Sequence, residues 1–261
     1  MRDSIACVGF AFSVVMLATA EIAVHYNFRT CARSSGIPAG AWDGLRPLTG
    51  PPPWREACDF FKAEPSSSRP PLVTCLRPRG DPESDGVREL GWFRGCEAVS
   101  PAWDEPLLVR RPNDIFLDVG AGLGACSLLM ASRGVHVVAL ETRPAELFRL
   151  TSGILANVLA ANVTVFPSRS ADDSAPLGRR VRLMRVAPDT DARLALDGAR
   201  GLLDTAAVRT VLLEHAGNGS ALVPACSALA SRRYSLWRAG RQLGGPPDCA
   251  GQGSVLAHWV A

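Results

Sequence analysis

The chain has 261 residues, of which 47% are hydrophobic and 20% charged, and its formal net charge is +3. This length is sufficient for one substantial domain with an additional segment. The basic residues are arginines scattered along the sequence and a single lysine, Lys62, and they form no stripe interleaved with aromatics. The pattern argues against a nucleic-acid-binding surface, and no nucleic-acid partner is predicted.

The N-terminal segment, residues 1–30, contains an apolar run at 5–20 that no charged residue interrupts. As a helix this run would be about 24 Å long, which is marginal for crossing a bilayer. Because Arg2 precedes the run and small residues end it, we predict a signal anchor or a cleavable signal peptide, with a buried helix as the alternative. Either signal implies a membrane or secretory-pathway location, in the Golgi or the endoplasmic reticulum, and an anchor implies membrane attachment through this segment.

The side of the membrane on which the rest of the chain lies is left open by the sequence. Arg29 and Arg33 follow the apolar run, and by the positive-inside rule they favour a cytoplasmic catalytic part. Eight cysteines and two glycosylation acceptor motifs, at Asn162 and Asn218, favour an oxidising lumen instead. We prefer the lumen. The disulfide pairing stays open, and no metal site is predicted, because no two cysteines have the C-x-x-C spacing.

Residues 31–85 are rich in proline, glycine and serine, which regular helices and central strands cannot accommodate. We predict a partly disordered stem here. Large aromatics such as Trp54 and Trp92 are too numerous in this region and just after it for a purely solvated tether. A short cap is therefore expected to begin at Gly86 and to pack on the main domain, so that cap and domain together span 86–261.

Strands and helices are predicted to alternate from residue 115 to the end of the chain. Apolar, β-prone runs predict strands at 115–119, 135–140, 162–166, 181–186 and 208–213, followed by a closing pair at 234–238 and 255–260. Helices are predicted between them, at 125–132, 145–160, 191–203 and 221–231. This order predicts an α/β fold: a Rossmann-like sheet, mostly parallel with an antiparallel closing strand pair, that binds its ligand over the carboxyl ends of the strands.

The loop after the first of these strands contains Gly120, Gly122 and Gly124. Residues without a Cβ allow a sharp turn and bring N–H groups at the positive end of the next helix against a polar ligand. Glu141 ends the neighbouring strand, where a carboxylate can accept the ribose hydroxyls of a nucleoside. Asp118, directly before the loop, would repel a pyrophosphate but suits a cationic sulfonium. We predict a site for a nucleoside-bearing cofactor, and a glycine turn that serves only helix packing is the alternative.

The order of these segments resembles the FkbM-type family of class I S-adenosylmethionine-dependent methyltransferases over residues 113–261. The matching pieces are N-D-I-F-L-D-V-G at 113–120, V-A-L-E at 138–141 with R-P at 143–144, N-V-T-V-F-P at 162–167 leading to S-A-D at 170–172, G-A-R-G-L-L at 198–203 and V-L-L-E at 211–214. The resemblance implies methyl transfer from S-adenosylmethionine, commonly to an oxygen of a sugar or another hydroxylated small molecule. It also implies which residues hold the cofactor: Asp118, Gly120, Gly122 and Gly124 the methionine part, Glu141 the ribose, and Ser170 and Asp172 the adenine edge.

The chain departs from this family after the strand predicted at 181–186. Members usually carry K-I-D-V-E-G-A-E there, whereas this chain reads R-V-A-P-D-T-D-A over 185–192. The aspartate position is Ala187, the glycine position is Thr190, and Asp189 keeps an acid at the glutamate position. Because a neutral alcohol is a poor nucleophile, an O-methyl transfer needs a base, and this is the motif that faces the reacting methyl group.

Four residues are candidates for the missing base: Asp189 and Asp191 on the loop after the fourth strand, and Glu214 and His215 at the end of the fifth. In the alternative interpretation Asp191 caps a helix and His215 is a surface loop residue. Cys126, in the helix after the glycine loop, is predicted to be a small buried apolar residue and not a nucleophile.

Three functions remain open. The first is an S-adenosylmethionine-dependent O-methyltransferase that acts on a small-molecule or glycan acceptor. The second is a catalytically inactive methyltransferase-fold protein with a binding or scaffold role, which the altered segment 185–192 motivates. The third is an NAD-dependent oxidoreductase, because Gly120, Gly122 and Ala125 also satisfy the G-x-G-x-x-A form of the dinucleotide fingerprint.

Overall fold

The computed structural model describes residues 58–64, 71–93, 96–105, 111–168, 170–172, 180–205, 207–215 and 219–260. The predicted signal segment and much of the predicted stem lie outside these residues, as does the acceptor motif at Asn218. Within the described ranges, no helix is both long and apolar enough to cross a membrane.

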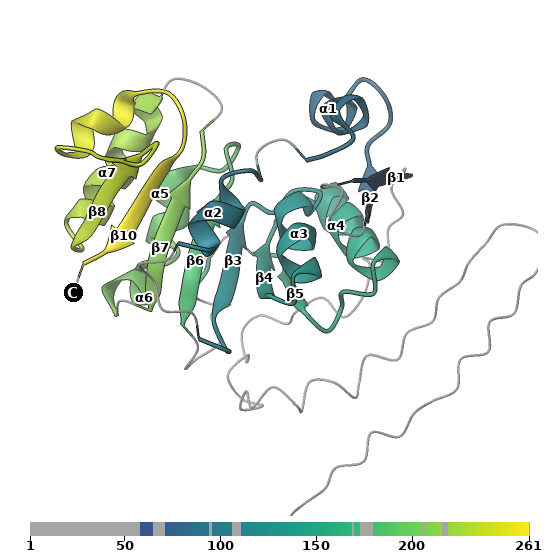
Figure 1. Cartoon of the computed structure of the whole chain (residues 1–261), viewed down its shortest axis with the longest axis horizontal. Helices are drawn as coiled ribbons and strands as arrows, with labels where there is room; N and C mark the ends of the chain where they lie inside the picture. Colours follow the sequence, from purple (N-terminus) through teal and green to yellow (C-terminus); the bar gives the residue numbers. More distant parts are fainter. Residues whose placement is uncertain are drawn as a thin grey trace, which may run out of the picture.

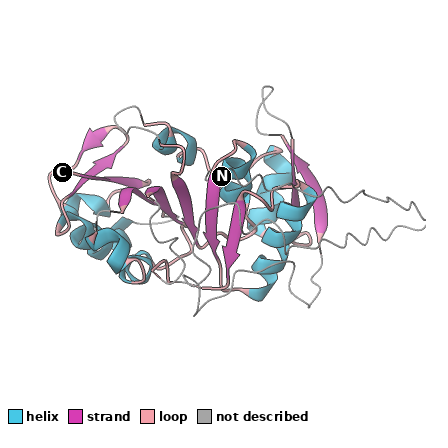
Figure 2. Cartoon of the chain, turned by 90° about the horizontal axis from the view of Figure 1, so that it is seen from below, coloured by secondary structure: helices cyan, strands magenta, loops and turns pink. Residues whose placement is uncertain are grey.

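An eight-stranded sheet runs through the centre of the molecule in the order β5-β4-β3-β6-β7-β10-β8-β9 (Figures 1 and 2). Its strands are β3 (Ile115–Val119), β4 (His136–Leu140), β5 (Val163–Phe166), β6 (Val181–Val186), β7 (Val208–Leu213), β8 (Tyr234–Arg238), β9 (Arg241–Gln242) and β10 (Val255–Trp259). The strands from β3 to β7 are parallel, whereas β10 is antiparallel to both β7 and β8. The predicted Rossmann-like sheet with an antiparallel closing pair is confirmed, and β9 adds a short edge strand.

Helices cover both faces of the sheet, which explains why every residue of β3 and β6 is buried. One core contains Phe116 of β3 and is formed with α2 (Val99–Trp103), α3 (Ala125–Ser132) and α4 (Pro144–Ala156). The other contains Leu117 of β3 and is formed with α5 (Ala192–Asp197), α6 (Arg200–Asp204) and α7 (Val223–Ala230). Two 3-10 helices, η2 (Gly219–Leu222) and η3 (Pro246–Ala250), contribute to this second core. The helix predicted at 191–203 is thus two short helices, separated near Gly198.

The cap begins earlier in the chain than the sequence suggested. An antiparallel hairpin of β1 (Asp59–Ala63) and β2 (Leu72–Leu76) precedes α1 (Pro82–Leu90). The side chain of Asn157, at the end of α4, bonds both the N–H and the C=O of Val73 in β2, at 2.8 and 2.6 Å, as a neighbouring strand would. The predicted boundary between residues 85 and 86 is wrong, because it falls inside α1 and separates the hairpin from the domain on which it packs.

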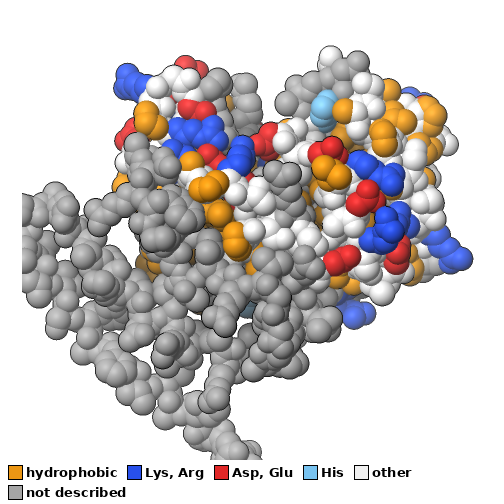
Figure 3. Space-filling model, turned by 180° about the vertical axis from the view of Figure 1, so that it is seen from behind, with side chains coloured by type: hydrophobic (Ala, Val, Ile, Leu, Met, Phe, Trp, Pro, Cys, Tyr) orange, Lys and Arg blue, Asp and Glu red, His pale blue; other side chains and the backbone are white. Residues whose placement is uncertain are grey.

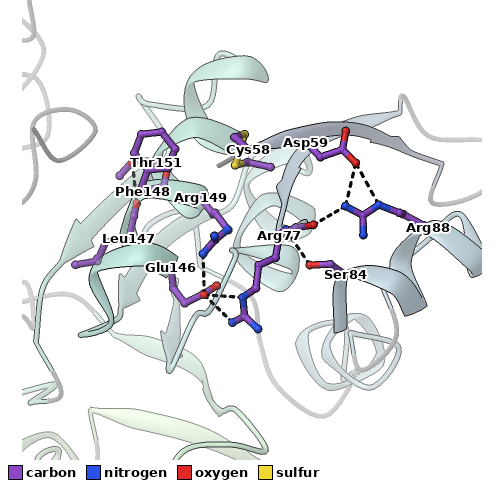
Figure 4. The surroundings of a disulfide bond; sticks show 11 residues. Cys58, Asp59, Arg77, Ser84, Arg88, Glu146, Leu147, Phe148, Arg149 and Thr151 are labelled. Carbon is purple, nitrogen blue, oxygen red and sulfur yellow. Dashed lines mark hydrogen bonds and ion pairs between the residues drawn. A yellow bond between two sulfur atoms is a disulfide. The ribbon is translucent and has the colours of Figure 1, made fainter. Parts of the chain in front are cut away.

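A buried ion pair also joins the cap to the main domain (Figure 4). Glu146 of α4 is only 2% exposed, and its Oε1 accepts hydrogen bonds from Arg77 at 2.6 and 2.9 Å and from Arg149 at 3.2 Å. Arg77 follows β2 directly, so this contact fixes the end of the hairpin against α4.

Three disulfides link the described cysteines: Cys58–Cys75 within the β1–β2 hairpin, Cys96–Cys126 and Cys226–Cys249. The second bond joins the segment before α2 to α3, the helix that follows the glycine loop. Cys126 is buried, as predicted, and its sulfur is bonded to Cys96, a pairing that the sequence had left open.

Candidate functional site

A cleft of about 270 Å³ opens at the carboxyl ends of β3, β4 and β6. The chain passes from β3 to β4 on one side and reaches β6 on the other, so this is the topological switch point of the sheet, where open α/β sheets bind ligands. The residues that line the cleft are Val119, Gly120, Leu140, Glu141, Thr142, Arg143, Ser168, Asp189, Thr190, Asp191, Leu194 and Ala195. Gly120, Glu141 and Asp189, three of the residues singled out from the sequence, therefore share one cleft.

Glu141 supplies a buried carboxylate at the end of β4, only 4% exposed. Its Oε2 accepts a hydrogen bond from the Gly122 N–H at 2.9 Å, and its Oε1 accepts from the backbone N–H groups of Thr142 and Arg143 at 2.7 and 2.8 Å. Burial alone would raise the pKa of Glu141, but the hydrogen bonds and charge of Arg143 outweigh it, so the pKa lies below its ordinary value. The carboxylate is ionised at neutral pH.

Arg143 bridges the two walls of the cleft. Its guanidinium contacts the Glu141 carboxylate through Nε at 3.3 Å and Nη2 at 3.1 Å, and its Nη1 lies 2.8 Å from Oδ2 of Asp189. Asp189 belongs to the loop after β6, so the bridge runs from the end of β4 to the opposite wall. The candidate base Asp189 is thus at the cleft, but it is ion-paired.

The backbone of the glycine loop is largely satisfied within the fold. The N–H groups of Gly120 and Ala121 both donate to the carbonyl of Leu140, at 2.9 and 3.0 Å, and that of Gly122 donates to Glu141. The expectation that these N–H groups face a ligand is not met, because each already has a protein acceptor.

Thr190 lies directly over Gly120. Gly120 has a φ of +76°, and a Cβ on it would overlap the Thr190 hydroxyl and lie 3.3 Å from Cβ of Ala187. Only glycine combines this backbone conformation with so close a neighbour. A threonine at the position where the FkbM pattern has glycine therefore reduces the space above the loop.

Asp118 is completely buried beneath the loop and does not line the cleft. Its Oδ1 accepts a hydrogen bond from Nη1 of Arg185 at 2.8 Å, and its Oδ2 accepts one from the Ser127 hydroxyl at 2.7 Å. Gly122 and Gly124 are also absent from the cleft lining. Of the four residues expected to hold a methionine group, the structure brings Gly120 alone to the cleft.

Glu214, directly after β7, shares Arg185 with Asp118. Its Oε2 lies 2.8 Å from both Nε and Nη2 of Arg185, so the guanidinium joins two buried carboxylates. Burial, together with the charges of Asp118 and Glu97, raises the pKa of Glu214 despite the opposing effect of Arg185. Glu214 does not line the cleft.

The remaining predicted residues lie away from the cleft. Both carboxylate oxygens of Asp172 accept hydrogen bonds from the first N–H groups of α6, at 2.8 and 3.1 Å, and the Ser170 hydroxyl donates to the carbonyl of Gly198 at 3.2 Å. Both residues thus hold the turn between α5 and α6, and from this loop it is Ser168 that lines the cleft.

Asp191 fits the alternative interpretation, in which it caps a helix, and His215 fits only part of its own, in which it is a surface loop residue. Asp191 caps α5, because its side chain accepts from the N–H of Leu194 at 3.0 Å, as the alternative interpretation predicted. His215 is half-buried and does not line the cleft.

Two arginines that had no predicted role organise this region. Arg185 is one of two arginines in β6, a strand whose six residues are all buried. A charged residue in such a strand requires a buried partner, and this was a signal in the sequence. Arg143 follows Glu141 by two residues in an exposed-looking turn, and nothing in the local sequence distinguishes it from a surface arginine.

Charged side chains of both signs are interspersed on the face shown in Figure 3. Over the described part of this face there is no continuous basic area. That the chain has no nucleic-acid partner stays a prediction.

No family model matches the sequence, and no curated protein matches it. Among solved structures, a T. thermophilus 16S rRNA N2 G1207 methyltransferase in complex with AdoMet and guanosine is 20% identical to this chain, with a TM-score of 0.47. The match covers 80% of this chain and 52% of that protein. A precorrin-6y C5,15-methyltransferase from Geobacter metallireducens is 15% identical, with a TM-score of 0.44, and the match covers 63% of this chain and 88% of that protein. A magnesium protoporphyrin IX methyltransferase from Synechocystis with bound SAM is 16% identical, with a TM-score of 0.43, and the match covers 62% of this chain and 76% of that protein.

The substrates in these names belong to the proteins concerned, and the likeness concerns the fold alone. By its own strand order, with antiparallel β10 between β7 and β8, the chain has the predicted α/β Rossmann-like fold. Membership of the FkbM family stays a prediction.

Proposed function

We propose that the chain binds S-adenosylmethionine in the cleft and transfers its methyl group to an oxygen of a hydroxylated, carbohydrate-like acceptor. The observation that carries the proposal is the ionised carboxylate of Glu141 beside the side-chain-free bend at Gly120, both at the switch point of the sheet. The cofactor supplies an electrophilic methyl group on its sulfonium, and the protein supplies binding, orientation and a proton acceptor.

The cleft residues fit the nucleoside part of this cofactor better than its methionine part. Glu141 would hold the ribose, and Leu194, which is 58% exposed, offers an apolar contact for a purine. The cleft volume of about 270 Å³ lies just below the range of roughly 300–1,000 Å³ for small-molecule pockets. A complete cofactor therefore requires Thr190 to move from its place over Gly120.

Asp189 is the residue proposed to take the proton of the acceptor hydroxyl. Of the two aspartates that line the cleft, it is the one that does not cap a helix, and its side chain is 53% exposed, so an acceptor can approach it. Glu214 stays a second candidate for this role, although the structure holds it beside Arg185 and outside the cleft lining.

Calorimetric titration of the full chain with S-adenosylmethionine tests the proposal. Glu141→Gln keeps the shape of the side chain but removes its charge, and we expect it to weaken binding at least tenfold. Glu64→Gln, which changes a largely exposed carboxylate in the cap, should leave the affinity unchanged. The proposal fails if the unaltered chain shows no measurable binding, and tight binding of NAD without S-adenosylmethionine would support the oxidoreductase instead.

A catalytically inactive binding protein is the second candidate function. Two observations favour it: Thr190 occupies the space over Gly120, and Arg185 neutralises the acids Asp118 and Glu214. Methyl transfer from labelled S-adenosylmethionine to extracted glycans separates the two candidates. Transfer that disappears in Glu141→Ala excludes the inactive protein, whereas binding without transfer to any hydroxylated acceptor supports it.

We also propose that the chain works in the secretory pathway, attached to a membrane through residues 1–30. The three disulfides support this location, because such bonds persist in oxidising compartments. Peptide mapping of protein from cells, after free thiols are alkylated without reduction, should recover the three linked peptide pairs. Alkylated Cys96 and Cys126 would contradict the location.

A further inference from the structure

We propose that Arg143 is an ionic latch across the cleft, which must leave Glu141 and Asp189 before Glu141 can receive a ribose hydroxyl. The inference rests on the proposed nucleoside site and adds a device that controls access to it. It makes the apparent affinity for a nucleoside depend on an ion pair within the protein.

The first step of the argument is the state of the Glu141 carboxylate. An ionised carboxylate offers about four lone-pair positions. Three backbone N–H groups, of Gly122, Thr142 and Arg143, and two guanidinium N–H groups of Arg143 already converge on it. With Arg143 in place the acceptor capacity is exhausted, and when its side chain leaves, one position becomes free for a hydroxyl.

The second step is the reach of the same guanidinium. Its third contact, to Asp189 at 2.8 Å, ties the end of β4 to the loop after β6. Thr190, the next residue of that loop, covers Gly120. Release of Arg143 therefore also frees the segment that restricts the space over the glycine bend.

The third step concerns whether the latch can open. The side chains of Arg143 and Asp189 are 45% and 53% exposed, so water can replace each as the partner of the other. The Arg143–Asp189 pair is therefore weak and screened by salt, whereas the Arg143–Glu141 pair involves a carboxylate that is only 3% exposed and is screened less. Glu141 stays buried, and its backbone donors keep it oriented while the guanidinium moves away.

Adenosine is the suitable probe, because it is neutral and salt acts on the latch and not on the ligand. Since the apparent dissociation constant is the intrinsic one divided by the open fraction, a latch that is open about one-tenth of the time weakens binding about tenfold. We expect Arg143→Met, which keeps the apolar stem, to bind adenosine about tenfold more tightly than the unaltered full chain. Asp189→Asn should show a smaller gain.

Salt provides a readout that a purely structural role for Arg143 would not change. Raising the salt from about 0.05 M to about 0.5 M should tighten adenosine binding to the unaltered chain, because screening opens the latch, and should leave Arg143→Met unaffected. Arg193→Met is the matched control: the Arg193 side chain is 50% exposed, and its Nε lies 3.0 Å from Asp197 on α5, outside the cleft lining. It should retain the affinity and salt dependence of the unaltered chain.

The outcomes are distinguishable once thermal unfolding shows that each variant is folded. Equal affinities for the unaltered chain and Arg143→Met overturn the latch but leave the proposed function intact. Weaker binding in Arg143→Met also overturns it, since Arg143 would then contact the ligand. If neither protein binds adenosine or S-adenosylmethionine, the proposed function itself fails and the latch with it.

Discussion

Arg185 forms ion pairs with Asp118 and Glu214, two acids that were predicted from the sequence to be site residues. Asp118 and Arg185 are register partners on the adjacent parallel strands β3 and β6, and Glu214 reaches the same guanidinium from the end of β7. Buried charges of this kind are tolerated only when they are paired, because desolvation is costly. The three residues thus form a structural unit beneath the cleft.

Replacing Arg185 with methionine tests whether the buried charges of Asp118 and Glu214 depend on this cation. Without the cation two carboxylates are left buried together, and we expect Arg185→Met to lower the free energy of unfolding by about 3–5 kcal/mol near neutral pH. The pKa of Glu214, already raised by burial, should rise further. When the pKa of an acid is higher in the folded state than in the unfolded state, the free energy of unfolding falls as the pH rises toward the folded-state pKa. The stability lost in Arg185→Met should therefore be smaller at about pH 5 than near neutral pH.

Urea denaturation of both proteins at acidic and at slightly alkaline pH measures this difference. Arg185→Lys keeps one positive charge and should lose less stability. An equal loss at both pH values would indicate lost packing in place of unpaired charge.

Individual residues were predicted from the sequence where a local pattern identifies them. Gly120 and Glu141 lie at the cleft, as the spacing of strand, glycine loop and strand indicated. Asp118 follows the same pattern, yet its carboxylate accepts a hydrogen bond from Arg185, 67 positions away, and does not line the cleft. Such a partner depends on strand order and register, which no short stretch of sequence encodes.

Elements were predicted well where hydrophobic runs were long and poorly where turn-forming residues interrupted them. The strands from β3 to β7 match their predicted runs to within a residue or two. The β1–β2 hairpin was missed because proline and serine at 65–71 suggested an irregular stem. Asn157 holds β2 through Val73, and Glu146 holds Arg77 directly after it; both partners belong to the α4 region and are distant in sequence.

The contact between β2 and α4 should contribute measurably to stability. Arg77→Met removes the main cation beside the buried Glu146 and, since Arg149 remains at 3.2 Å, we expect a loss of about 1–3 kcal/mol. Lys62→Met, in an exposed pair with Glu64 on the same hairpin, should change stability by less than about 0.5 kcal/mol. Chemical denaturation of the three proteins in parallel decides the matter, and similar losses in both variants would show that the buried pair has no special weight.

For the whole molecule, the two cores on opposite faces of the sheet differ in what completes them. The core that contains Phe116 includes Leu72 and Leu76 of β2 as well as Trp103 of α2, so cap and main domain share one set of buried side chains. The core that contains Leu117 is built from the main domain alone. The cap is therefore part of the folding unit and not a separate attachment.

A chain that begins at residue 86 should consequently be less stable than one that begins at residue 58. Removing the buried leucines of β2 alone should cost about 3–6 kcal/mol, and the shorter chain would also lack the Arg77–Glu146 ion pair and the hydrogen bonds from Asn157 to β2. Thermal unfolding of the two chains measures the joint contribution of the hairpin and the first residues of α1, because both chains lack the same first 57 residues. Equal melting temperatures would show that the hairpin is dispensable.

The bond between Cys96 and Cys126 has a practical consequence for anyone who prepares this protein. It fastens the start of α3, directly after Gly124, to the segment that leads into α2. Material produced in a reducing bacterial cytosol would lack this covalent tie one turn away from the glycine bend. Binding measurements therefore require material in which the bond between Cys96 and Cys126 has been shown to be intact.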